Sequence, residues 1–253
     1  MYKEEEQEQE YAIIYFDFDN IWATLLDATN SVSKYNIKDD ENLKNIQKDL
    51  QKSLEDFLNK ILEYLTEKYS VKYIKAYSDF NSLLFSEHVN IVDTLHKYGI
   101  KTYTPYVRNN KDMSDRALII AAIHDVMSKE PEIMEPKLIL FTGDIDYLPL
   151  FEYISEYTDC EFEIFSFENR LSQGYSEVFY TKNKITKIDE LLGINTKELE
   201  EAKKLQIFKE YVQEKNLDIN KHIDYQRTIR NLNREYYCRF NQNSIKSYIQ
   251  KLK

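Results

Sequence analysis

The chain has 253 residues and a net charge of −10, with 44 Asp and Glu against 34 Lys and Arg. This length allows one α/β domain of about 190 residues and a small appendage. The negative charge argues against strong nonspecific binding of nucleic acid. No apolar stretch approaches the length of a transmembrane helix.

The cysteines and the N-terminus both favour a reducing compartment. Cys160 and Cys238 are far apart in the sequence, and a single pair is too few for a disulfide framework. Residues 1–10 form an acidic run that lacks the basic and apolar regions of a secretion signal, and we expect them to be disordered. We therefore predict a cytoplasmic protein without a membrane partner.

Charge is distributed unevenly along the chain. From Ile194 to Lys253 there are 13 Lys and Arg against 8 Asp and Glu, a net charge of +5, which leaves −15 for the rest. We therefore predict a main domain of residues 11–193 and a basic helical C-terminal unit of residues 194–253.

The first predicted strand is Tyr11–Phe16, an unbroken apolar run typical of a strand buried on both faces of a parallel sheet. From about Glu41 to Tyr69, Leu and Ile recur every three or four residues, which predicts an amphipathic helix. Gly99 is suited to end a further helix. The other elements expected in this half are a strand at 71–77, a helix at 87–98 and a strand at 100–103.

The second half opens with a helix predicted from Asp115 to about Ser128, with Ser114 as its N-cap. Strands that alternate with helices indicate a mainly parallel sheet covered on both faces. The remaining expected elements are a strand at 137–141, a helix at 147–157, a strand at 161–166 and tail helices near 196–215, 221–232 and 242–252.

Two acidic clusters follow predicted strands. Asp17, Asp19 and Asn20 come after the first strand, and Asp144 and Asp146 come after the strand at 137–141. Ligands of open α/β sheets bind beyond the carboxyl ends of the strands, because loops from several strands meet there. We therefore expect both clusters at one edge of the sheet.

A third acidic group stands at the start of the helix before the second cluster. It consists of Asp115, with Asp112 as an additional candidate. Crowded carboxylates repel one another and shift one another's pKa values, so their coexistence favours a cation between them. A donor set of oxygens alone suits Mg²⁺ or Mn²⁺.

Three segments resemble the motifs of NYN domains, which are PIN-like nucleases. Phe-Asp-Phe-Asp-Asn-Ile, residues 16–21, resembles the opening motif, an Asp followed by an acid and then Asn. Phe-Thr-Gly-Asp-Ile-Asp-Tyr-Leu-Pro-Leu, residues 141–150, is similar to the family's Ser-Gly-Asp-x-Asp-Phe-x-Pro-Leu signature. Between them, residues 114–118 resemble the family helix that begins with an Asp. The likeness spans about residues 11–193 and leaves the tail outside.

This resemblance implies a PIN-like or Rossmann-like α/β fold, a mainly parallel sheet flanked by helices, with a small C-terminal helical extension. It also implies a metal-dependent ribonuclease that hydrolyses RNA phosphodiester bonds with Mg²⁺ or Mn²⁺. The catalytic candidates are Asp17, Asp19, Asn20, Asp115, Asp144 and Asp146. Of these, Asp17, Asp115, Asp144 and Asp146 are the candidate metal ligands, and Asp146 or Asp19 would orient the attacking water.

Each acidic residue also has a purely structural interpretation. Asp17, Asp144 or Asp146 could cap a turn or helix, and Asp115 could simply favour the helix dipole. The sequence also departs from the family at Ala121, where NYN helices often carry a second Asp. His124 and Asp125 do not replace it, because they lie about 180° and 80° from the face of Asp115.

Basic residues near the clusters and in the tail are candidates for contacts with RNA phosphates. The tail residues could equally form a solvated helix face, and the C-terminal helices are candidates for a homodimer contact or a regulatory partner. The candidate RNA-binding residues are Arg108, Lys111, Arg116, Arg227, Arg230 and Arg234, with Arg239 as a further tail arginine.

Two other functions compete with the nuclease interpretation. In a haloacid-dehalogenase-like phosphatase, Asp17 and Asp19 would act as nucleophile and acid–base, and Thr142 would bind phosphate. Thr142 and Asp144 are too close in sequence to leave room for the lysine that such enzymes need. The other alternative is a non-catalytic, RNA-binding or regulatory NYN protein, which Ala121 supports.

Overall fold

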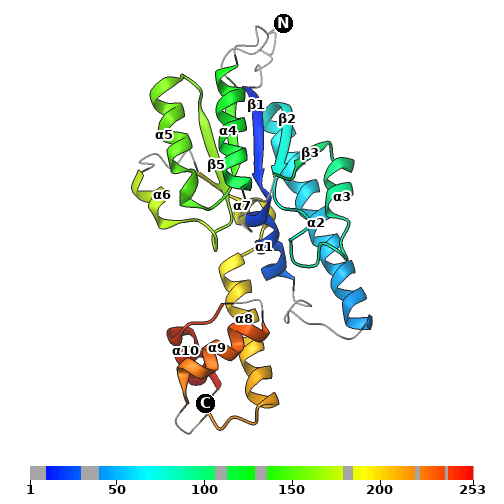
Figure 1. Ribbon diagram of the computed structural model, residues 1–253, viewed down its shortest axis with the longest axis vertical. Coiled ribbons are helices and arrows are strands. Elements are labelled where there is room, and N and C mark those ends of the chain that lie inside the picture. The colour runs from blue at the N-terminus through cyan, green and yellow to red at the C-terminus, as the bar shows by residue number, and fades with distance from the viewer. Residues whose placement is uncertain are drawn as a thin grey trace, which may run out of the picture.

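The apolar run near the start of the chain is the central strand of a parallel sheet (Figure 1). The computed structural model describes residues 10–29, 40–105, 113–128, 136–178, 185–219, 223–236 and 239–252. The strands of these residues are β1 (Glu10–Asp17), β2 (Tyr69–Tyr77), β3 (Ile100–Tyr103), β4 (Lys137–Phe141), β5 (Phe162–Ser166) and β6 (Ile185–Lys187).

Helices alternate with these strands. They are α1 (Phe18–Ala28), α2 (Asp40–Lys68), α3 (Ile91–Lys97), α4 (Ser114–Met127), the 3₁₀ turn η1 (Ile145–Tyr147), α5 (Leu148–Tyr157), α6 (Gln173–Val178), α7 (Ile188–Leu192), α8 (Thr196–Glu214), α9 (Tyr225–Glu235) and α10 (Gln242–Leu252). The predicted α/β fold with C-terminal helices is confirmed.

The sheet has the strand order β3-β2-β1-β4-β5-β6, and every pair is parallel. The chain adds β2 and β3 on one side of β1, and β4, β5 and β6 on the other. The order therefore reverses between β1 and β4. Loops that leave such a switch point diverge and make room for a ligand at the carboxyl edge.

Alternate side chains of β1 enter two different cores. Ala12, Ile14 and Phe16 pack with α1, α2 and α3, whereas Ile13 and Tyr15 pack with α4 and α5. All five side chains are buried. A strand covered on both faces has no polar side, which explains why its sequence is an unbroken apolar run.

The C-terminal helices have an apolar cluster of their own, in which Phe208, Leu232 and Tyr248 are fully buried. Figure 1 places these helices beyond the edge at which β1 ends. The first half of α8 also packs against α1. The C-terminal unit is thus joined to the sheet domain through α1.

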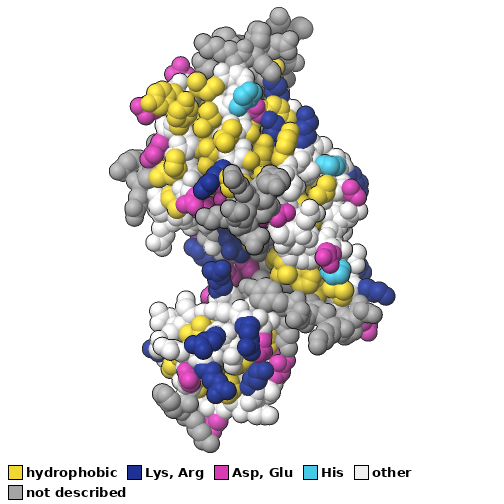
Figure 2. All heavy atoms as spheres, viewed as in Figure 1, with side chains coloured by type: hydrophobic (Ala, Val, Ile, Leu, Met, Phe, Trp, Pro, Cys, Tyr) yellow, Lys and Arg dark blue, Asp and Glu magenta, His cyan; other side chains and the backbone are white. Residues whose placement is uncertain are grey.

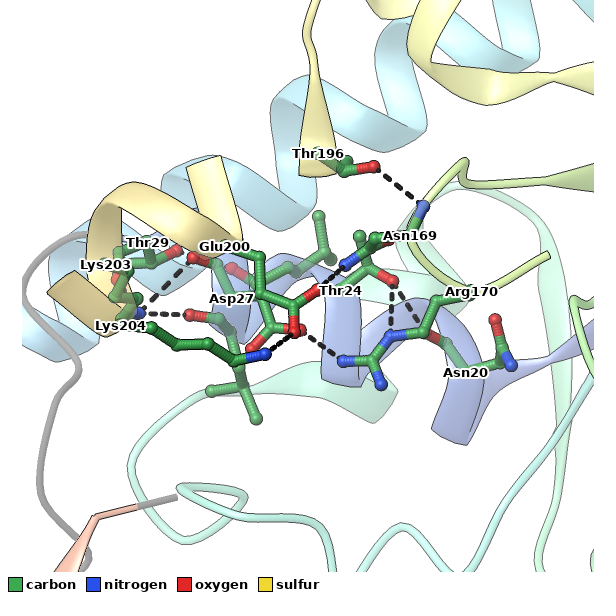
Figure 3. A network of polar contacts seen from close by, with 12 residues as sticks. Asn20, Thr24, Asp27, Thr29, Asn169, Arg170, Thr196, Glu200, Lys203 and Lys204 are labelled. Atoms are coloured by element: carbon green, nitrogen blue, oxygen red, sulfur yellow. Dashed lines mark hydrogen bonds and ion pairs between the residues drawn. The ribbon is translucent and has the colours of Figure 1, made fainter. Parts of the chain in front are cut away.

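A buried lysine contributes several of the polar contacts between α8 and α1. The ammonium of Lys203 on α8 donates to the backbone carbonyl of Leu26 at 2.7 Å and also to that of Thr29, at the end of α1 (Figure 3). Beside it, Arg170 forms an ion pair with Asp27 of α1. A cation at a helix C-terminus satisfies carbonyls that have no partner within the helix and complements the helix dipole.

Several sequence predictions need correction. The charged stretch after β1 begins with a helix, α1, which was not predicted, and neither were α6 and the three-residue strand β6. The helix expected at 87–98 covers only Ile91–Lys97. Ser114 does not cap α4, because it is the first helical residue and Met113 holds the cap position without a side-chain hydrogen bond.

Two further expectations concern the N-terminal residues and transmembrane helices. Residues 1–9 of the segment expected to be disordered lie outside the described residues. Glu10, the last residue of that segment, is the first residue of β1. Within the described part of the chain, no helix is both long and apolar enough to cross a lipid bilayer.

We predict that Lys203→Met lowers the free energy of unfolding by about 1–3 kcal/mol, because the carbonyls at the end of α1 would lose their buried donor. Lys209→Met on the exposed side of the same helix is the matched control, and it should have little effect. Urea denaturation of the two variants and the wild type measures the difference. Equal stability of the two variants would contradict the capping role.

Candidate active site

Asp17 occupies the point where β1 becomes α1. Its side chain caps α1 by accepting the backbone N–H of Asn20 at 3.5 Å, and its other oxygen accepts the hydroxyl of Thr142 at 2.7 Å. Thr142 directly follows β4, so this second bond crosses the switch point of the sheet. Only 5% of Asp17 is exposed. The capping interpretation is therefore correct for one oxygen, while the other oxygen joins two strands.

The environment of Asp17 disfavours its negative charge. Burial, followed by the nearby carboxylates of Asp115 and Asp19, raises the pKa of Asp17 to about 8, against the opposing hydrogen bonds from Thr142 and the Asn20 N–H. Burial and like charges both favour a protonated carboxyl group. The electrostatic effect of Asp115 also places α4 close to the end of β1.

Tyr147 lies among the acidic groups of three elements. Its hydroxyl donates to Asp115 at 2.8 Å. Burial raises the pKa of Tyr147, and the carboxylates of Asp17, Asp115 and Asp144 raise it further. These three carboxylates, from β1, α4 and the turn after β4, are therefore all within electrostatic reach of one buried phenol.

Asp144 sits on a tight turn. Its side chain accepts the N–H of Asp146 at 3.0 Å and so caps η1, which means that Asp144 rather than Asp146 has the capping role. A Cβ at Gly143 would lie 2.3 Å from the backbone oxygen of Arg170, so only glycine allows this packing. The hydroxyl of Tyr175 donates to the backbone carbonyl of Asp144.

The remaining acidic candidates lie at the rim of this cluster. Asp19 is half-buried and accepts the hydroxyl of Ser78 at 3.1 Å, and Ser78 follows β2. Asp146 is exposed, and it contributes to the raised pKa of Tyr175. Asn20 takes part through its backbone N–H.

The donor chemistry of this edge fits a hard divalent cation, because carboxylate oxygens are the protein ligands that Mg²⁺ and Mn²⁺ prefer. The carboxylates lie farther apart than the ligands of an occupied metal site do. Among the residues described by the structure, no group of three or more Asp, Glu, His or Cys side chains is close enough to hold a metal ion.

Ala121 and its neighbours do not add a carboxylate to the cluster. The hydroxyl of Tyr15 donates to the Ala121 carbonyl at 3.2 Å. Burial would raise the pKa of Asp125, but hydrogen bonds from Lys75, Tyr15 and Tyr73 outweigh it and lower the pKa to about 2. Asp125 is thus an anchor between α4 and the sheet.

The candidate RNA-binding residues are scattered. Arg108 and Lys111 lie outside the described residues, as does Asp112. Arg116 is exposed and adjoins Asp115 in α4. The tail arginines Arg227, Arg230 and Arg234 are exposed on α9, in the separate C-terminal cluster of helices, and Arg239 is exposed after it.

Several supporting residues were not singled out by the sequence. The sequence alone gives Thr142 a role only as a phosphate-binding group of a phosphatase, and it gives Ser78, Tyr147 and Tyr175 none. Thr142 and Tyr147 flank the Gly-Asp-x-Asp motif, and this position in the sequence could have identified them as residues of the site. No pattern in the sequence identifies Ser78, because the pairing of β2 with β1 brings it to Asp19.

The fold and the acidic carboxyl edge of the sheet together define an α/β protein with an acidic site at the switch point of a parallel sheet. The family model described as NYN domain matches residues 14–177, which is more than half of the chain. The chain belongs to the NYN-domain family, whose members are generally nucleases.

Comparison with solved structures supports the fold. The chain is similar to a crystal structure of a protein of unknown function from Vibrio parahaemolyticus, with 18% sequence identity and a TM-score of 0.50. The match covers 74% of this chain and 98% of the other. No curated protein matches the sequence.

We predict that Asp17→Asn stabilises the protein in EDTA at pH 8 relative to wild type. The pKa of Asp17 is higher in the folded than in the unfolded chain, so the wild type loses stability as the pH rises from about 4 towards 8, and Asn removes this loss. The gain should grow by at least about 1 kcal/mol between pH 5 and pH 8. Urea denaturation at both pH values measures it, and a gain independent of pH would contradict the assignment.

Proposed function

We propose that this protein is a divalent-metal-dependent ribonuclease that cuts RNA phosphodiester bonds internally at the carboxyl edge of β1 and β4. The observation that carries the proposal is the gathering of Asp17, Asp115 and Asp144 around Tyr147. A phosphodiester needs concentrated positive charge to react. An edge that collects carboxylates from three elements is suited to provide it by holding cations.

Asp17, Asp115 and Asp144 are the proposed ligands, with Asp146 as a fourth. Thr142 and the Asn20 N–H fix the orientation of Asp17, and the phenol of Tyr147 fixes that of Asp115. When bound, Mg²⁺ or Mn²⁺ would lower the pKa of a water molecule and offset the charge that develops on the phosphoryl oxygens.

Positioning of the attacking water falls to the rim residues. Asp146 is exposed on the turn after β4. Asp19 is half-buried and held by Ser78 from the neighbouring strand. Either carboxylate can accept a hydrogen bond from water and so orient its lone pair.

RNA is the proposed substrate because the sequence resembles nucleases of the NYN family. Arg116 is exposed and adjoins Asp115 in α4, so it is the described residue that we propose meets a phosphate at this edge. Binding of RNA by the arginines of α9, a cytoplasmic location, and a homodimer or regulatory contact through the C-terminal helices stay predictions.

A non-catalytic, RNA-binding NYN protein is the second candidate. It is favoured by Ala121, which supplies only a backbone carbonyl to Tyr15 where the family often has a second Asp. A change at the aspartates should remove cutting from a nuclease while RNA binding is kept. A non-catalytic protein has no cutting to lose.

We predict that the purified protein cuts mixed RNAs with Mn²⁺ or Mg²⁺ but not with EDTA, and that Asp144→Asn lowers the cutting rate at least about 100-fold, because a carboxylate ligand is lost. Asp159→Asn is the matched control, since Asp159 is exposed just before β5, at the opposite edge of the sheet. Gel analysis of cleavage and anisotropy of labelled RNA measure cutting and binding separately.

RNA binding without any metal-dependent cutting would support the non-catalytic candidate. Equal cutting by wild type and Asp144→Asn would contradict the proposed site. Release of phosphate from a small phosphomonoester, lost in Asp17→Asn, would support a phosphatase instead.

A further inference from the structure

Helix α9 carries a stripe of arginines on its outer face. Arg227, Arg230 and Arg234 follow one another at spacings of three and four residues, so they lie within about 60° of one another around the helix. All three are exposed, whereas Thr228 and Leu232 on the other side of the helix are buried. We call these three arginines the arginine face. Figure 2 shows Lys and Arg side chains gathered on the part of the C-terminal unit where Figure 1 places α9.

The arginine face lies in a positively charged segment of a protein whose net charge is −10. From residue 223 to residue 252 there are six Lys and Arg against two Asp and Glu. Glu235 lies 3.6 Å from Arg234, but it also faces Lys215 at 3.5 Å, so two cations share this one carboxylate. The segment therefore attracts anions, although the rest of the chain is acidic.

Helix α9 is held near both ends by hydrogen bonds from side chains. At its start, Asp224 accepts the backbone N–H of Arg227 at 3.1 Å. Near its end, the side-chain amide of Asn233 donates to the carbonyl of Phe240 at 3.2 Å and accepts the N–H of Phe240 at 2.7 Å. The arginines thus project from a backbone that is already ordered, which lowers the entropic cost of binding a ligand.

The spacing of the arginine face suits the backbone of a double helix. Arg227 and Arg234 are seven residues apart, which is about 10 Å along the axis of α9. One strand of a nucleic-acid duplex presents about three phosphates over that distance. A guanidinium group binds phosphate oxygens through two parallel N–H groups. A polyanion with regularly spaced phosphates is therefore the ligand that charge and spacing favour.

The C-terminal helices do not offer the aromatic surface on which unpaired bases stack. Among the described residues, none of the large hydrophobic side chains that are exposed belongs to α8, α9 or α10. Proteins that bind single strands without sequence preference stack the bases on such rings. Duplex RNA is bound mainly through its shape, its phosphates and its 2′-hydroxyl groups. The arginine face therefore suits paired RNA better than an unpaired strand.

The arginine face is remote from the candidate active site. Helix α1 extends for 11 residues, or about 16 Å, from Asp17 to the end that Lys203 satisfies. The helices α9 and α10 pack with the part of α8 that follows Lys203, beyond the end of α1 (Figure 1). An RNA that contacts both places must bridge a distance on the order of 20 Å, or about six base pairs.

We propose that the arginine face of α9 binds the phosphate backbone of a base-paired segment of RNA. The choice of RNA rests on the proposed ribonuclease function. The inference adds that the substrate contains a paired segment, which the C-terminal unit holds away from the bond to be cut. Phosphate contacts carry no sequence information, so binding should depend on base pairing and not on sequence.

Binding of a labelled RNA hairpin with a 12-base-pair stem, measured by anisotropy in EDTA, tests this proposal. EDTA prevents metal-dependent cutting, so binding is measured whether or not the protein is a nuclease. We predict that Arg227→Gln/Arg230→Gln/Arg234→Gln weakens binding at least about tenfold and reduces the slope of log affinity against log salt by about 2–3. Glutamine is a good helix former, so the variant should keep α9 intact.

Lys44→Gln/Lys48→Gln/Lys52→Gln is the matched control, because it makes the same change in charge on the exposed side of α2. It should leave hairpin binding nearly unchanged. An unpaired RNA of the same length should bind the wild type at least about fivefold more weakly than the hairpin. Equal losses in the two triple variants would overturn the inference, since only overall charge would then matter. So would equal affinity for the unpaired RNA, or tighter binding of a DNA duplex or an acidic peptide.

The outcomes separate the arginine face from the catalytic proposal. If the arginine variant loses hairpin binding but the wild type never cuts RNA with Mn²⁺ or Mg²⁺, the arginine face binds paired RNA and the nuclease proposal fails. If the wild type cuts RNA and the arginine variant binds and cuts as well as the lysine control, the proposal for the arginine face fails alone.

Discussion

The hydrogen bond from Thr142 to Asp17 joins the two strands between which the sheet reverses its order. At this point the chain leaves β1 and β4 towards opposite ends of the sheet, so their loops separate and polar groups can enter. The buried carboxyl group of Asp17 is placed there by a strand whose side chains from Ala12 to Phe16 are all buried. The other acidic groups are arranged around this position, on α4 and on the turn that Gly143 allows.

Much of this could be predicted from the sequence, because β1 and β4 are short apolar runs that each end in a motif of aspartates. Asp17 and Asp144 could thus be assigned to one edge. The helix α1 could not, since it begins directly after Asp17 and its first residues, Phe18, Asp19 and Asn20, belong to the motif that resembles the opening of NYN domains. The strand β6 is only three residues long. The contacts of Ser78 and Asp125 depend on strand register and on the position of α4, neither of which leaves a local pattern.

The helix α1 connects the acidic edge with the C-terminal helices. At its start, Asp17 accepts an N–H, and at its end, Lys203 donates to carbonyls, so both termini of α1 are satisfied by side chains. Arg170, whose backbone packs against the turn of Gly143, also reaches Asp27. The position of the first aspartate and that of the turn before Asp144 are therefore fixed by the same neighbouring elements.

The match to the NYN domain ends at residue 177, yet the side chain that satisfies the end of α1 comes from α8. A shortened version of this protein that stopped at the limit of recognisable similarity would expose carbonyls that are now buried, and it would also lack β6 at the open side of β5. We therefore expect a stable fragment to extend beyond the piece that sequence comparison recognises, through β6 and α8. Anyone who transplants this module into another protein should carry α8 along with it.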